Sequence, residues 1–192
     1  MEADLTGQGE ITAASPRAEV LVVEASTSAN WKASTPEVYS YLRELSHLLP
    51  ELPRLKGLKI ASHSGMARLL MGIPVLGKTL DYVIDLKAEY IPEEGIIILD
   101  SLPNLQTQLF GPCPVGYTPI NFRAEIKVSQ GRPNECRIKA NIRLGMIEWP
   151  GVLRIFEGTI FTKMAHPLAR EQAQKIIDEL VARLQKAFAK TR

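Results

Sequence analysis

The sequence has little net charge, little cysteine and no long hydrophobic run. Its 23 basic residues nearly balance 21 acidic ones, which leaves +2 and does not suggest a nucleic-acid binder. No run of about 18 apolar residues is present, so we expect no membrane span. The stretch 1–17 is polar and lacks the apolar core of a signal peptide, so we expect a soluble, cytoplasmic protein with a flexible arm at 1–17.

The two cysteines do not indicate an oxidising compartment. Cys136 falls on the apolar side of an alternating stretch and is interpreted as a small core residue. Cys113 lies in the loop GPCPVG. The two could be bridged, but nothing in the pattern indicates a disulfide.

Motifs for metal, phosphate or nucleophilic chemistry are also missing. His47, His63 and His166 have no partner at a metal-ligand spacing, and there is no G-x-S-x-G motif or glycine-rich phosphate loop. Asp81 and Asp85 share the polar side of one predicted strand, so we interpret them as a solvated face. We therefore predict no metal site, no cofactor and no catalytic residue that can be named.

What the sequence does contain is a globular core and a long amphipathic helix. At 192 residues, 45% of them hydrophobic, the chain is expected to form one domain over residues 18–190. The segment Pro167–Phe188 places its apolar residues three and four apart, which predicts a helix with one dry face. Pro167 fits the first turn of this helix, where its missing N–H costs nothing.

A series of alternating segments precedes that helix. Glu19–Ala33 predicts a first strand, and the run Ser34–Glu37 predicts a helix start, followed by a shorter helix broken by Pro50 and Pro53. The further predicted strands have wet and dry faces that indicate an antiparallel sheet covered on one side. They are Leu58–Ser62, Thr79–Ile91, Gly95–Leu102, Leu105–Phe110, Ile120–Val128 and Cys136–Leu144.

Two apolar segments leave alternatives open. Met66–Gly77 is interrupted by glycine and proline, and is either a membrane-contacting lid with Arg68 at the lipid headgroups or a buried crossover. Met146–His166 is a partly helical linker, in which Trp149 either gates the end of the sheet or simply plugs it.

The segment Trp31–Leu55, WKASTPEVYSYLRELSHLLPELPRL, resembles the opening of the START-like (SRPBCC) superfamily, which includes polyketide cyclases and Bet v 1-related proteins. There a strand leads into a small-Pro-Glu-x-Val-Phe/Tyr helix start. The resemblance extends in element order from about Leu21 to Phe188. It implies an α+β helix-grip fold, with a curved antiparallel sheet wrapped around a long C-terminal helix and two small helices after the first strand.

The resemblance also implies an apolar cavity between sheet and final helix, since members bind lipids, sterols, polyketides or hormones and some are enzymes. We therefore expect a hydrophobic small molecule or lipid as partner, no nucleic acid, and transient contact with a membrane. The residues expected to bind it are Tyr82, Ile84, Tyr90, Phe122, Ile142, Glu148, Trp149, Leu153, Phe156, Ile177 and Leu180.

Two other functions remain open. A cyclase or aromatase would need an acid or base in the cavity, for which Glu148, Tyr82 and Tyr90 are the candidates. Alternatively, side chains fill the space between sheet and final helix, and the protein acts through its surface. The sequence does not choose between these and does not give the oligomeric state.

Overall fold

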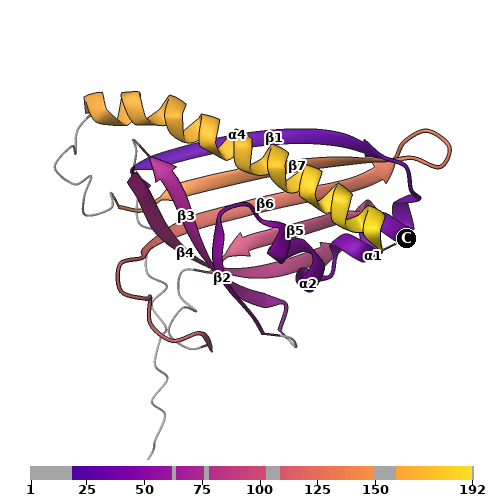
Figure 1. Ribbon diagram of the computed structural model, residues 1–192, viewed down its shortest axis with the longest axis horizontal. Coiled ribbons are helices and arrows are strands. Elements are labelled where there is room, and N and C mark those ends of the chain that lie inside the picture. The colour runs from indigo at the N-terminus through magenta and orange to yellow at the C-terminus, as the bar shows by residue number, and fades with distance from the viewer. Residues whose placement is uncertain (1–18, 62–63, 76–77, 103–108, 149–158, 192) are drawn as a thin grey trace, which may run out of the picture.

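The protein is one curved sheet with helices on its concave side (Figure 1). The computed structural model describes residues 19–61, 64–75, 78–102, 109–148 and 159–191. Within these residues the sheet has seven strands in the order β1-β7-β6-β5-β4-β3-β2. Neighbouring strands are antiparallel, with one short parallel contact between β4 and β6. The α+β helix-grip architecture expected from the sequence is confirmed.

The elements follow the expected order along the chain. They are β1 (Leu21–Trp31), α1 (Thr35–Leu42), α2 (Leu45–Leu48), the 3-10 helix η1 (Leu49–Glu51), β2 (Leu55–Ala61), β3 (Met66–Val75), β4 (Lys78–Ile91), the 3-10 helix η2 (Pro92–Glu94), β5 (Ile96–Ser101), β6 (Thr118–Gln130), β7 (Cys136–Met146) and α4 (Thr159–Lys190).

Helix α1 begins where the sequence predicts. Ser34 is the N-cap, and its backbone N–H and its hydroxyl donate to the Glu37 carboxylate at 3.1 and 2.7 Å. A proline in the first turn and an acidic side chain near the positive helix end both favour this start. Val38 and Leu42 then turn inward and are fully buried.

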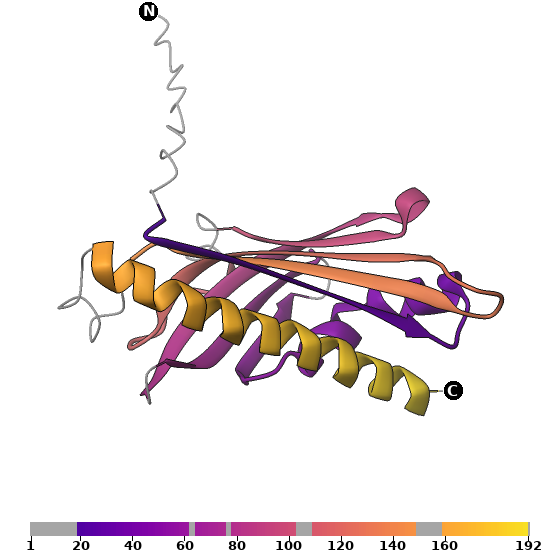
Figure 2. The same cartoon turned by 90° about the horizontal axis from the view of Figure 1, so that it is seen from above.

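Helix α4 lies along β1 on the same side of the sheet as the small helices (Figure 2). Its C-terminal end is fixed by Phe188, whose ring lies 5.6 Å from that of Trp31 and 5.2 Å from that of Tyr41. Gln174 and Gln185 donate to backbone carbonyls of β1. The buried face is the predicted apolar stripe, made of Ala173, Ile176, Ile177, Leu180, Val181, Leu184 and Phe188.

Pro167 lies inside α4 and not in its first turn, because the helix already begins at Thr159. An interior proline removes one backbone hydrogen bond. The surrounding stretch is open to water, since the side chains of Met164 and Leu168 are 68% and 43% exposed. Water can therefore hydrate the carbonyl that loses its partner, which lowers the cost of the proline.

Residues 66–75 of the segment Met66–Gly77 form neither a lid nor a crossover, because they are strand β3, between β2 and β4. The proline that argued against a strand is Pro74. Strand β2 pairs with β3 only as far as Met71, so Pro74 lies beyond the end of β2, where β4 is its one pairing partner. A missing N–H is tolerated at such a position.

Replacing Gly95 by Ala is expected to lower the free energy of unfolding by about 2 kcal/mol or more, measured by urea denaturation. Gly95 ends the β4–β5 turn with φ of 65°, and a Cβ there would lie 2.3 Å from the Val128 carbonyl oxygen. Gly116→Ala is the matched control, because Gly116 also has positive φ but open space around it. Equal losses in both variants would contradict the steric part of this argument.

Several predicted features lie outside the described residues. They are the arm at 1–17, Ser62, His63, most of the predicted strand Leu105–Phe110, and Trp149, Leu153 and Phe156.

Candidate functional site

An apolar pocket lies between the sheet and α4. Strands β3 to β7 form its floor, η1 and the end of α2 close one side, and Ile176, Ile177 and Leu180 of α4 cover it. The volume is about 30 Å³, far below the roughly 300–1,000 Å³ of sites that hold small-molecule ligands. The side chains therefore nearly fill the space in this conformation.

Among the described lining residues, Tyr82 has the one polar side chain that faces into this pocket. Asn141 also borders it, but strand alternation places the Asn141 side chain on the outer face, between inward-facing Ala140 and Ile142. Tyr82 is 2% exposed, and burial raises the pKa of its hydroxyl well above the ordinary value. The hydroxyl thus stays protonated at neutral pH and can donate a hydrogen bond to a guest.

The buried Tyr82 hydroxyl also predicts a pH dependence of stability. Because the folded-state pKa is raised, its stabilising contribution is complete below the unfolded value near 10 and is lost as pH rises above it. We expect Tyr82→Phe to lose less stability than the parent protein between about pH 9 and 11, measured by urea denaturation. Parallel pH profiles for the two proteins would contradict a buried, neutral hydroxyl.

The structure brings together six of the residues expected to bind ligand: Tyr82, Ile84, Phe122, Ile142, Ile177 and Leu180 all line the pocket. Glu148 is exposed on the surface after β7. Tyr90 lies instead in a separate groove beside α1 and α2, and is 40% exposed. The sequence reasoning missed the lining residues Leu48, Leu49, Leu52, Met71 and Ile73.

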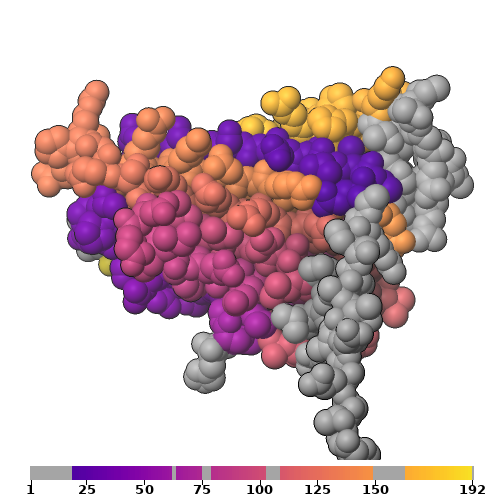
Figure 3. Space-filling view, turned by 180° about the vertical axis from the view of Figure 1, so that it is seen from behind, coloured from indigo at the N-terminus to yellow at the C-terminus, as the bar shows by residue number. Residues whose placement is uncertain are grey.

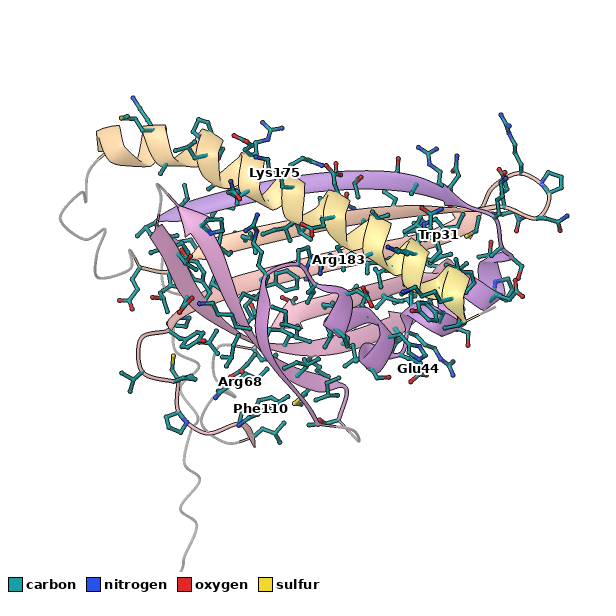
Figure 4. All side chains as sticks on the ribbon, in the orientation of Figure 1. Trp31, Glu44, Arg68, Phe110, Lys175 and Arg183 are labelled. Atoms are coloured by element: carbon teal, nitrogen blue, oxygen red, sulfur yellow. The ribbon has the colours of Figure 1, made fainter. Side chains whose placement is uncertain are left out.

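The polar face of β3 and β4 differs from the expectation of a solvated surface. Arg68 and Asp85 are each 3% exposed, and the guanidinium meets the carboxylate through two bonds of 2.6 and 2.8 Å. Arg68 also donates to the carbonyls of Phe110, Gly111 and Pro112, at 2.9–3.0 Å. Figure 4 shows Arg68 beside Phe110, well away from α4. Arg68 is therefore not available to lipid headgroups.

The described lining contains no carboxylate, histidine, lysine or arginine. Proton transfer in this pocket would fall to Tyr82, whose raised pKa makes its hydroxyl a weak acid and keeps it protonated, so that no phenolate base is present at neutral pH. Among the described helices, none is long and apolar enough to cross a membrane.

No protein-family profile matches the chain, and no curated protein does. Solved structures do resemble it. A START superfamily protein from Mycobacterium smegmatis has a TM-score of 0.56 at 14% identity, covering 88% of this chain and 99% of its own. The Streptomyces aromatase/cyclase Zhui has a TM-score of 0.58 at 12% identity, covering 89% and 96%.

A third similar structure is the di-domain ARO/CYC StfQ of the steffimycin biosynthetic pathway. Its TM-score is 0.57 at 18% identity, and the match covers 90% of this chain and 52% of StfQ. Identities at this level establish fold and not activity. The sheet order, the grip of the sheet around α4 and these likenesses together give the chain a START-like helix-grip fold.

Proposed function

We propose that the protein binds a hydrophobic small molecule between the sheet and α4. The observation that carries this proposal is the pocket lining. It consists of apolar side chains from five strands and from α2, η1 and α4, with one inward hydroxyl, that of Tyr82. Ligand sites have this composition, with a few polar groups that orient a mostly apolar guest. The similar START superfamily protein and aromatase/cyclases support the same choice by fold analogy.

Binding requires the pocket to widen, and the ends of α4 differ in how firmly they are held. The C-terminal end is fixed by the aromatic contacts of Phe188 with Trp31 and Tyr41. The N-terminal end extends past the sheet with Met164 and Leu168 exposed (Figure 1). Tilting of α4 about its fixed C-terminal end would lift Ile176 and Ile177 from the floor and admit a guest.

The experiment has two parts. Protein purified under native conditions is examined by mass spectrometry for a co-purifying apolar molecule, and delipidated protein is titrated with a fluorescent fatty acid. We expect bound mass in the first or saturable fluorescence in the second. Failure of both would overturn the proposal.

The small volume of the pocket favours a second candidate function. In this candidate, side chains fill the core and the protein acts through its surface. A pocket of this size leaves no room for a guest unless α4 moves. This candidate predicts no bound mass and no saturable uptake, so the same experiment separates the two. An aromatase or cyclase reaction gains no support from the described lining, which lacks an acid or base other than Tyr82.

A further inference from the structure

The hydroxyl of Tyr82 is open to the pocket under α4. Among the described residues, three buried polar atoms have neither a partner nor contact with water, on Trp31, Tyr39 and Gln172, and the Tyr82 hydroxyl is not one of them. No described group bonds to it, and burial is the one cause of its raised pKa. The pocket of about 30 Å³ exceeds the roughly 10–15 Å³ that a water molecule needs. A small group of a guest can therefore reach this hydroxyl.

The neighbours of Tyr82 on the inner face of the sheet are apolar or neutral. Met71 pairs with it on β3, and Leu80 and Ile84 flank it on the same side of β4. These three side chains are each 6% exposed or less. Thr118 pairs with Tyr82 on β6, carries a neutral hydroxyl and does not line the pocket. A guest group at this position therefore meets one available hydroxyl within an apolar surround.

The charged side chains nearest in the sheet lie on its other face. Asp81 and Asp85 alternate with Tyr82 along β4, and Arg68 of β3 bonds to Asp85 on that outer face. An ionised group beside Tyr82 would lose its water and gain no opposite charge from these residues. A neutral carbonyl or hydroxyl group would accept the hydrogen bond of Tyr82 without that cost.

We propose that Tyr82 makes the pocket selective for an apolar molecule that carries a neutral hydrogen-bond acceptor, such as a ketone, an ester or a hydroxyl group. The acceptor takes the hydrogen bond of the Tyr82 hydroxyl, and the apolar body lies between the sheet and α4. This inference rests on the proposed function, because the guest still needs α4 to tilt. A fatty acid fits the same space only with its carboxylate turned away from Tyr82.

The test compares three probes with the same ring system: 2-acetylnaphthalene with a ketone, 2-ethylnaphthalene with no acceptor, and 2-naphthoate with a charge. Amide proton–nitrogen correlation spectra of the full chain are recorded during titration with each probe. We expect 2-acetylnaphthalene to shift the amides of Tyr82, Ile84 and Phe122, with affinity about fivefold above that of 2-ethylnaphthalene. We expect 2-naphthoate to bind about tenfold or more weakly than the ketone.

Tyr82→Phe should remove the preference for the ketone and leave the affinities for 2-ethylnaphthalene and the fluorescent fatty acid unchanged. Tyr90→Phe is the matched control, because Tyr90 lies on the same side of β4 and does not line the pocket. Infrared spectra give a direct readout of the bond. The carbonyl band of bound 2-acetylnaphthalene, labelled with carbon-13, should lie at lower wavenumber in the parent protein than in Tyr82→Phe.

Equal affinities for the ketone and the hydrocarbon, or a ketone preference that persists in Tyr82→Phe, would overturn this inference. So would binding of 2-naphthoate as tight as that of the ketone. If the fatty acid still binds saturably in either case, the proposed function stands and the selectivity alone is lost. If neither the three probes nor the fatty acid binds, and no apolar molecule co-purifies, both are overturned.

Discussion

Arg68→Ala is expected to lower the free energy of unfolding by about 3–5 kcal/mol, because it leaves the Asp85 carboxylate buried without its cation. The two side chains are each 3% exposed, and the guanidinium bonds to both carboxylate oxygens. The variant also frees the carbonyls of Phe110, Gly111 and Pro112, which lose their shared donor. Urea denaturation followed by circular dichroism gives the difference.

The matched control is Lys56→Ala, which breaks the ion pair between Lys56 of β2 and Asp81 of β4, the two strands on either side of β3. That pair is 2.5 Å long but has side chains 43% and 30% exposed, so its loss is expected to cost about 1 kcal/mol or less. Arg68→Lys should keep the charge but lose the paired geometry, and should fall between the two. A loss in Arg68→Ala no larger than in Lys56→Ala would contradict the structural role assigned to the buried pair.

The sequence could not reveal this pair, because its burial depends on a distant loop. Alternation along β4 correctly separates Tyr82 and Ile84 from Asp85, but alternation identifies a face and not what covers it. Residues 110–112 lie over the outer face at this point, and their carbonyls accept hydrogen bonds from Arg68. Elsewhere no helix of the described residues lies over that face, and the strands β1, β7, β6 and β5 follow one another across it (Figure 3).

The lining residues of the pocket could be predicted from the sequence where the pattern of a single strand or helix determines which side chains face inward. Period two along β4, β6 and β7 predicts Tyr82, Phe122 and Ile142, and the helical period predicts Ile177 and Leu180, since each pattern depends on local geometry. Leu48 and Leu49 could not be placed in the same way, because their position depends on how η1 packs across the sheet.

Tyr90 shows the limit of the same pattern within one strand. It shares the inward parity of Tyr82 and Ile84, eight and six residues before it. The long strand β4 extends beyond the region covered by α4, so its last inward residue meets α1 and α2 and borders their groove. Alternation along β4 therefore predicted which side of the sheet Tyr90 faces, but not which elements lie next to it.

The proposed pocket makes its sharpest prediction at Leu180, which covers it from α4 and is 6% exposed. Leu180→Trp puts a larger side chain into a space of about 30 Å³, so we expect the affinity for the fatty acid to fall by about tenfold or more. Overpacking should also cost about 1–3 kcal/mol of stability. Leu168→Trp is the control, because Leu168 lies on the same helix, is 43% exposed and does not line the pocket.

Leu180→Ala tests the same position with the opposite change in volume. It should lose about 2–5 kcal/mol of stability through the cavity it creates, and it should bind the fatty acid at least as tightly as the parent protein. A filled core predicts a different pattern, with no binding by the parent and new binding by Leu180→Ala alone. Equal affinity of the parent, Leu180→Trp and Leu180→Ala would place the bound molecule outside this pocket, because no guest between the sheet and α4 could be indifferent to both changes.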